Sequence, residues 1–295
     1  MDYVTLAPGL PPSSRLGFGC GSVMGRVGRG ESLRAIAAAC DGGITHFDVA
    51  RLYGYGEAEA LLGEALRGRR DRVVVASKFG LSAPSRAAAL RGLKPVAQRL
   101  AAAVPGARGV LRSLVGGAAR SADRFSAGAA EVSLNQSLAA LDTDYLDILF
   151  LHDCAADDLS DELAGFLDRQ LAIGKIRAYG VATSIEAVLP VYAARGGTVL
   201  YQFANSLVAR NAERLAGAER QVLTHSPFLG ADRLAALVGR GEAHQAMLTY
   251  ALAAKAVAVV LCSMLDAAHL EANLAAVERP RFTADEIAAL AARIR

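Results

Sequence analysis

The stretch Gly43-Ile-Thr-His-Phe-Asp48 has the pattern of a short apolar strand that ends in an acid, and Tyr53 follows five residues later. Two further apolar runs end in a polar side chain, Val73-Val-Val-Ala-Ser-Lys78 in an amine and Ile148-Leu-Phe-Leu-His152 in an imidazole. Because the carboxyl ends of parallel strands meet at one face of a barrel, we expect the acid, the phenol, the amine and the imidazole to converge on one pocket. There, burial and neighbouring charges can shift their pKa values so that the group exchanges a proton with a reacting oxygen.

Short apolar runs alternate with Ala- and Leu-rich amphipathic segments along nearly the whole chain, which is typical of strand–helix units with a parallel sheet. We expect strands near Arg15–Gly19, Thr45–Asp48, Arg72–Lys78, Tyr145–His152, Ala178–Ala182, Thr198–Gln202, Gln221–His225 and Ala256–Ser263. We expect helices at segments such as Ser32–Asp41, Ala58–Leu66, Ala129–Leu141, Asp161–Ile173, Ile185–Ala194 and Gly241–Lys255, and a last helix capped by Thr283. Eight strands with interposed helices favour an α/β fold of the (β/α)8 TIM-barrel type, with residues 1–295 as a single domain.

One segment departs from the alternation of strands and helices. Residues 79–125 follow the third strand and far exceed the roughly two to six residues of an ordinary strand–helix loop. Between Leu81 and Phe125 eight basic residues face Asp123 alone, so this stretch carries a net charge of +7 and the rest of the chain −4. The segment is expected to be a helical basic insertion over the barrel mouth. It is either a cationic lid for an anionic substrate or cofactor, or a set of solvated helices that pad the barrel.

Composition and charge exclude several classes of protein. The formal net charge of +3 is too small to indicate nucleic acid as a general partner. The five histidines show no metal-ligand spacing, and the four cysteines show no paired spacing of a metal site or disulfide framework, so no metal is predicted. The amino terminus lacks the pattern of a signal peptide, and no apolar run is long enough to span a membrane. We therefore expect a cytoplasmic protein without a membrane partner, and the oligomeric state stays open.

The four polar residues suit proton transfer to a carbonyl oxygen. When hydride reaches a carbonyl carbon, negative charge develops on the oxygen, and Tyr53 could donate a proton to it. Lys78 is expected to lower the pKa of Tyr53, Asp48 to keep Lys78 charged, and His152 to orient the carbonyl. Taken singly, each residue also has a structural explanation. The acid could cap the next helix, the tyrosine could pack in a loop, the lysine could be a surface residue at a strand end, and the histidine could be buried in the core. Together, at the ends of neighbouring strands, they indicate a catalytic site.

The stretch Gly43–Glu59, with Ser77-Lys-Phe-Gly80 and Leu151-His-Asp153, resembles the aldo-keto reductase superfamily. The resemblance covers nearly the whole chain outside the insertion. It implies a (β/α)8 barrel, an NAD(P)-dependent oxidoreductase, and a catalytic tetrad at the matching positions Asp48, Tyr53, Lys78 and His152.

The resemblance also implies a cofactor site at the ends of the later strands. It places Gln202 and Thr183 near the nicotinamide carboxamide, and the loop after the seventh strand along the pyrophosphate. The implied cofactor-binding residues are Thr183, Gln202, His225, Ser226, Phe228, Gly230, Ser263 and Asn273.

The sequence leaves the choice between NADP and NAD open. Relatives usually hold the 2′-phosphate with a lysine or arginine, and Ser263, Leu265 and His269 stand in those places. A guanidinium is the preferred phosphate ligand, so tolerance of NADH or preference for it is expected unless an arginine of the insertion compensates. Substrate choice is expected to depend on the insertion and on the Gly21–Gly30 loop.

The leading prediction is hydride transfer between an alcohol or lactol and an aldehyde or ketone, with Tyr53 as the general acid and base. The substrate would be a small carbonyl or alcohol, such as a sugar lactol or another polar compound, or an anionic one if the insertion is a lid. Two alternatives remain: elimination or isomerisation on the same tetrad, and a nucleotide-sensing module without catalysis.

Overall fold

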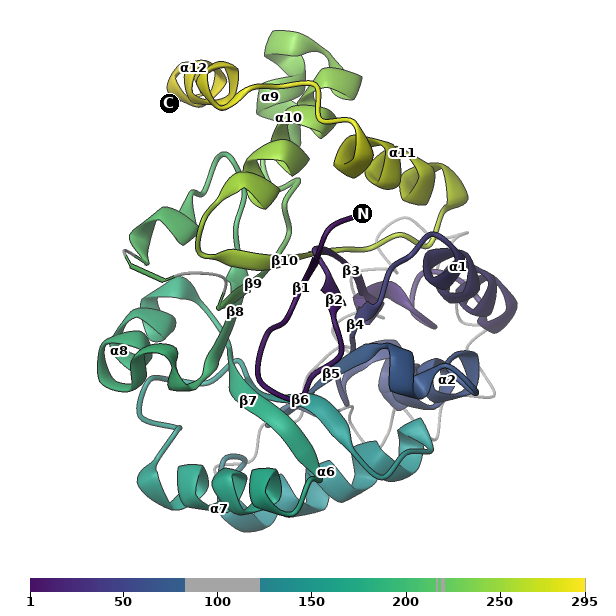
Figure 1. The fold of residues 1–295 in the computed structure, drawn as a ribbon, viewed down its shortest axis with the longest axis vertical. Coiled ribbons are helices and arrows are strands. Elements are labelled where there is room, and N and C mark those ends of the chain that lie inside the picture. Colours follow the sequence, from purple (N-terminus) through teal and green to yellow (C-terminus); the bar gives the residue numbers. More distant parts are fainter. Residues whose placement is uncertain (83–122, 216, 219–220, 295) are drawn as a thin grey trace, which may run out of the picture.

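Eight parallel strands form a closed barrel in the computed structural model, which describes residues 1–82, 123–215, 217–218 and 221–294. Neighbours around the ring follow the order β10-β3-β4-β5-β6-β7-β8-β9 (Figure 1). The strands are β3 (Leu16–Gly19), β4 (His46–Asp48), β5 (Val74–Phe79), β6 (Leu146–His152), β7 (Ile176–Ala182), β8 (Leu200–Ala204), β9 (Val222–His225) and β10 (Val257–Cys262). The predicted TIM barrel is confirmed, and each predicted strand lies within two residues of an observed one.

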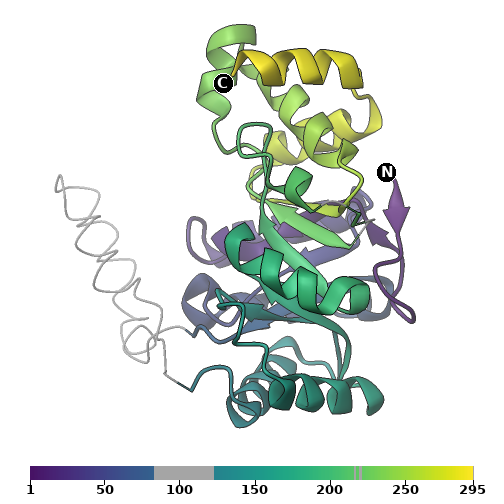
Figure 2. The same ribbon diagram turned by 90° about the vertical axis from the view of Figure 1, so that its left-hand side faces the viewer.

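Helices surround this ring (Figure 1). They are α1 (Arg29–Asp41), α2 (Ala58–Ala65), α6 (Ala127–Leu141), α7 (Asp161–Ala172), α8 (Ile185–Arg195), α9 (Ala231–Val238), α10 (Arg240–Ala253), α11 (Ala267–Glu278) and α12 (Ala284–Arg293). Several begin at a side chain that accepts a backbone N–H, and the predicted cap Thr283 forms a capping box with Glu286. Helices α9, α10 and α12 bury their own apolar cluster and gather on one side of the barrel (Figure 2). Within the described part of the chain, no helix is long and apolar enough to cross a membrane.

An amino-terminal hairpin, which the sequence analysis did not anticipate, lies across one end of the barrel (Figure 1). Its strands are β1 (Tyr3–Val4) and β2 (Ser13–Ser14), and the loop between them carries Leu6 and Leu10. These two leucines pack on inward-facing side chains near the amino ends of the strands, such as Val74. The amino-terminal end is therefore filled by apolar side chains, which leaves the carboxyl ends of the strands for ligands.

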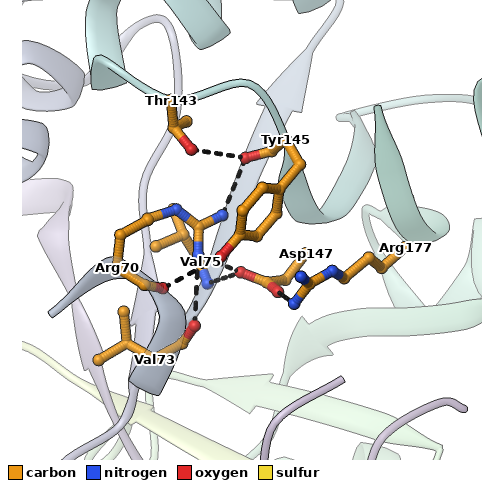
Figure 3. Close-up of polar contacts among 7 residues, drawn as sticks. All are labelled: Arg70, Val73, Val75, Thr143, Tyr145, Asp147 and Arg177. Carbon is orange, nitrogen blue, oxygen red and sulfur yellow. Dashed lines mark hydrogen bonds and ion pairs between the residues drawn. The ribbon is translucent and has the colours of Figure 1, made fainter. Parts of the chain in front are cut away.

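A buried ion network joins β5, β6 and β7 near their amino ends (Figure 3). Asp147 is fully buried, and its Oδ2 accepts hydrogen bonds from Arg70 Nη1 at 2.7 Å and from the Val75 backbone N–H at 2.9 Å. Its Oδ1 accepts from Arg177 Nη1 at 2.9 Å. The ring of Tyr145 has one guanidinium 4.1 Å and the other 4.0 Å from its centroid. Every carboxylate oxygen of this network is thus satisfied.

The predicted insertion falls mostly on residues 83–122, which lie outside the described residues, so its helical lid stays a prediction. Its ends are anchored. The ring of Phe125 meets that of Phe79 edge-on, with centroids 5.7 Å apart, and Arg124 Nη2 donates to the backbone carbonyl of Asp153 at 2.9 Å. The carboxyl end of the insertion therefore lies beside the strand that ends in His152.

Candidate active site

A cavity of about 800 Å³ opens at the carboxyl ends of the barrel strands. Its lining contains all four predicted catalytic residues, Asp48, Tyr53, Lys78 and His152. Asp48 and His152 are the last residues of β4 and β6, and Lys78 is the penultimate residue of β5. The structure thus brings together the side chains that the strand ends predicted.

A tight loop after β4 carries Tyr53 to the same cavity. Tyr53 begins a short 3-10 helix (Tyr53–Gly56), in which Gly54 and Tyr55 have positive φ angles of 59° and 60°. A Cβ atom at Gly54 would lie 2.8 Å from both the Cβ of Met24 and the carbonyl oxygen of Val23. Gly54 is therefore required both by the backbone angle and by the close approach of the preceding loop.

Asp48 and Lys78 form an ion pair at the floor of the cavity, and their side chains are 5% and 3% exposed. Lys78 Nζ also donates to the carbonyl oxygen of Val49 at 3.1 Å, and Gln202 Nε2 donates to Asp48 Oδ2 at 2.8 Å. Burial by itself lowers the pKa of Lys78, but the negative charge of Asp48 and the interaction with Tyr53 outweigh it and raise this pKa above its ordinary value. The ammonium therefore stays charged although it is buried.

The pKa of Tyr53 departs from the expectation. Burial raises it, and the Lys78 ammonium, whose Nζ lies 5.2 Å from the ring centroid, lowers it by less. The contribution of Lys78 thus has the expected sign, but the net direction is upward. Desolvation of the phenolate is the larger effect. Tyr53 is consequently a neutral phenol that is ready to donate a proton.

His152 faces Tyr53 across the cavity, with ring centroids 6.0 Å apart and the rings perpendicular. Burial lowers the pKa of His152 to about 4, and the charge of Lys78 acts in the same direction. The imidazole is therefore neutral near pH 7. Its Nδ1 atom is buried and has no hydrogen-bond partner among the described residues, and the same holds for Oε1 of Gln202. Such orphaned polar atoms indicate a site built for a polar ligand.

A second cavity of about 500 Å³ adjoins the first, since Phe228 and Ser263 line both. It contains Asn273, whose Oδ1 lies 2.8 Å from Nε2 of His244. The ring of His244 stacks on that of Phe228 with centroids 4.8 Å apart. The first cavity therefore carries the predicted catalytic group, and the adjoining second cavity carries a stacked aromatic pair together with charged side chains.

The predicted cofactor residues are divided between these cavities. The first cavity is lined by Thr183, Gln202, His225, Ser226, Phe228 and Ser263. Gly230 lines neither; with a φ of 83° it caps α9. The hydroxyl of Thr183 donates to the carbonyl oxygen of Cys154 at 2.7 Å, so its proton is already used.

The sequence analysis missed a cation in the second cavity. Arg26 belongs to the Gly21–Gly30 loop, which was expected to shape substrate choice. In the structure Gly21 and Ser22 line the first cavity, whereas Arg26 and Val27 line the second. No motif marks Arg26, and only the placement of the loop reveals it.

Metal ligands are not grouped in this site. Within residues 1–82, 123–215, 217–218 and 221–294, no three His, Cys, Asp or Glu side chains gather so that they could hold a metal ion.

The family model described as "Aldo/keto reductase family" matches residues 15–216. The chain therefore belongs to the aldo/keto reductase family, and this membership agrees with the barrel and with the predicted enzyme class, an oxidoreductase.

Similar proteins carry related names. The chain is 37% identical over 87 residues to aldo-keto reductase YhdN of Bacillus subtilis, and this match covers 28% of this chain and 26% of that protein. It is 30% identical over 174 residues to D-threo-aldose 1-dehydrogenase of a Pseudomonas species, a match that covers 58% of this chain and 48% of the relative. The chain thus matches half or less of the length of these curated relatives. Among solved structures, the holo form of an aldo-keto reductase from Bacillus halodurans has a TM-score of 0.76 at 24% identity, covering 100% of this chain and 96% of that one.

Proposed function

We propose that the protein interconverts an alcohol or lactol and an aldehyde or ketone, using a nicotinamide cofactor, with Tyr53 as the general acid and base. One observation carries this proposal. A charged ammonium, a neutral phenol and a neutral imidazole line one cavity that continues into a second, aromatic cavity. This combination suits proton transfer to an oxygen on which negative charge develops.

In the reducing direction, the O–H bond of Tyr53 breaks as an O–H bond forms on the substrate oxygen. The phenol is protonated at the start because its pKa is raised. The phenolate that forms lies beside the Lys78 ammonium, which Asp48 holds in the charged form. Solvent then returns the proton to Tyr53 through the open cavity. In the oxidising direction the same oxygen accepts the proton.

His152 orients the substrate in this scheme. Because its imidazole is neutral near pH 7, one ring nitrogen can donate a hydrogen bond to the carbonyl oxygen without adding a positive charge. Its position across from Tyr53 supports a carbonyl oxygen held between the two rings.

The cofactor, when bound, supplies the hydride. The residues of this chain fit its two ends. Oε1 of Gln202 is an unused acceptor in the first cavity for an amide such as the nicotinamide carboxamide. Asn273 and Phe228 offer an amide and an aromatic face in the second cavity. The cofactor is NADH or NADPH; the carboxyl end of β10 has no permanent cation at Ser263, Leu265 or His269, which supports acceptance of NADH.

The substrate proposed is a small polar carbonyl such as a sugar-derived aldehyde or lactol. Ser22, Asp153 and Glu186 line the first cavity with polar or negative groups, which suits hydroxyl-bearing compounds better than anions. The relative from Pseudomonas is named for an aldose. An anionic substrate would need the basic insertion, residues 83–122 of which lie outside the described residues.

Cofactor oxidation tests this proposal. The protein is mixed with NADH or NADPH and a panel of aldoses, small aldehydes and ketones, and the absorbance at 340 nm is followed. We expect a carbonyl-dependent decrease. Binding of the cofactor in calorimetry without oxidation by any carbonyl would instead favour a nucleotide sensor. Turnover of a hydroxy carbonyl without any cofactor would favour elimination or isomerisation.

A further inference from the structure

Arg26 is a charged residue that no step of the proposed reaction uses. It lies in the loop between β3 and α1, its side chain is exposed, and it lines the second cavity together with His269 and Asn273. Within the described part of the chain its guanidinium forms no hydrogen bond or ion pair, whereas Arg29, three residues later, is paired with Glu64. An unpaired guanidinium at a cavity wall is available to a ligand.

The acids of this cavity are already engaged. Oε2 of Glu31 accepts a hydrogen bond from the backbone N–H of Gly28 at 3.1 Å at the amino end of α1. Oδ1 of Asp266 accepts from the N–H of Ala268 at 2.8 Å as the cap of α11. Both carboxylates sit at positive helix ends, which offset part of their charge. Among the described residues that line this cavity, Arg26 is therefore the one arginine, and its guanidinium is left for an anion.

The arrangement of the cavities indicates which anion this is. Phe228 and Ser263 line both cavities. A dinucleotide whose nicotinamide ring lies beside Tyr53 would extend past these two residues, so that its adenosine half would lie in the second cavity. Resting on the proposed function, we propose that Arg26 binds the 2′-phosphate of NADP(H) and replaces the cation that the carboxyl end of β10 lacks. A guanidinium can hold a phosphate through two parallel hydrogen bonds. Since Arg26 is exposed, it stays hydrated when the 2′-phosphate is absent, and NADH is still accepted.

Isothermal titration of the full chain with NADPH, NADH, 2′,5′-ADP and 5′-AMP tests this inference. For Arg26→Ala we expect about 10-fold or greater weakening of NADPH and 2′,5′-ADP, the range of a lost charge-assisted phosphate contact. NADH and 5′-AMP should change less than twofold. Arg26→Lys keeps the charge and should retain part of the selectivity. Arg29→Ala, which removes a neighbouring cation that does not line the cavity, is the matched control and should bind all four ligands like the parent.

Three results would overturn the inference. Unchanged NADPH affinity in Arg26→Ala removes Arg26 from the site. Equal weakening of NADPH and NADH assigns Arg26 to the pyrophosphate instead of the 2′-phosphate. If Arg29→Ala weakens NADPH binding as much as Arg26→Ala does, the effect is one of general charge and not of a contact with Arg26. Failure of the parent chain to bind either dinucleotide is a different outcome, because it refutes the proposed function itself.

Discussion

Two ends of the same barrel carry the same three kinds of side chain, a buried aspartate, a cation and a tyrosine. At the amino end, Asp147 is enclosed by two arginines and a backbone N–H, with Tyr145 between the guanidiniums. At the carboxyl end, Asp48 is bound by Lys78 and Gln202, and Tyr53 lines an open cavity.

The difference shows what separates a structural ion network from a reactive one. Arginine keeps its proton at any ordinary pH, and its planar fork satisfies a carboxylate, so both oxygens of Asp147 are used and the one orphaned atom of the network, Nε of Arg70, is a donor that does not give up its proton. Lysine gives up its proton more readily than arginine does. The ammonium of Lys78 interacts with both the carboxylate of Asp48 and the phenol of Tyr53. Orphaned atoms on His152 and Gln202 remain beside it. The amino-end network therefore should govern stability, and the carboxyl-end group should govern turnover.

The largest expected effect concerns Tyr53. Tyr53→Phe should lower turnover by about 10² to 10⁴, the usual contribution of a general acid, and should leave cofactor binding and unfolding unchanged. Steady-state kinetics measures the turnover, isothermal titration the cofactor binding, and urea unfolding the stability. Tyr145→Phe is the matched control, because it removes a tyrosine hydroxyl at the other end, and its turnover should equal that of the parent. Turnover of Tyr53→Phe within threefold of the parent would refute the assignment.

The next effect concerns Asp147. Asp147→Asn leaves two partly exposed guanidiniums without a carboxylate and should lower the free energy of unfolding by about 2 kcal/mol, less than for a fully buried pair because both arginines keep contact with solvent. The turnover of the folded fraction should not change. Urea unfolding gives the stability. Asp41→Asn, which alters an exposed pair with Arg69, is the control and should leave the free energy of unfolding nearly unchanged, because solvent screens exposed pairs. A loss below that of the control would contradict the structural role.

Acid should destabilise the barrel through histidines. Burial lowers the pKa values of His152 and His46 to about 4, from an ordinary value of 6.5. The unfolded chain therefore takes up protons first, and stability falls as the pH decreases from 6.5 towards 4, by about 1.4 kcal/mol per pH unit for each histidine. His152→Gln should remove one such contribution from urea unfolding measured between pH 7 and 5. An unchanged slope in His152→Gln would show that its imidazole is charged in the folded protein.

The smallest effect concerns the faces of the Tyr145 ring. Tyr145→Leu removes both guanidinium–ring contacts and should lower the free energy of unfolding by about 1 kcal/mol, since the two contacts are partly exposed. Tyr145→Phe keeps the ring and should lose less. Equal losses in the two variants, measured by urea unfolding, would assign the stabilisation to the hydroxyl instead.

Much of the fold was readable from local patterns. Continuous apolar runs predicted the buried parallel strands, and Thr283 predicted the start of the last helix, which the structure confirms. The hairpin with Leu6 and Leu10 escaped prediction because strands of two residues show no periodicity. Ion networks such as that of Asp147 also escape, because their partners lie far apart in the chain.

The sequence by itself determined the order of strands and helices, and with it the convergence of Asp48, Tyr53, Lys78 and His152, because parallel strands of one barrel must end at the same face. Tertiary structure decided the rest. Burial of the phenol among distant parts of the chain turned the pKa of Tyr53 upward against the charge of Lys78. The path of the β3–α1 loop brought Arg26 to the second cavity. Burial and the meeting of distant loops depend on how the whole chain packs, and no local pattern encodes them.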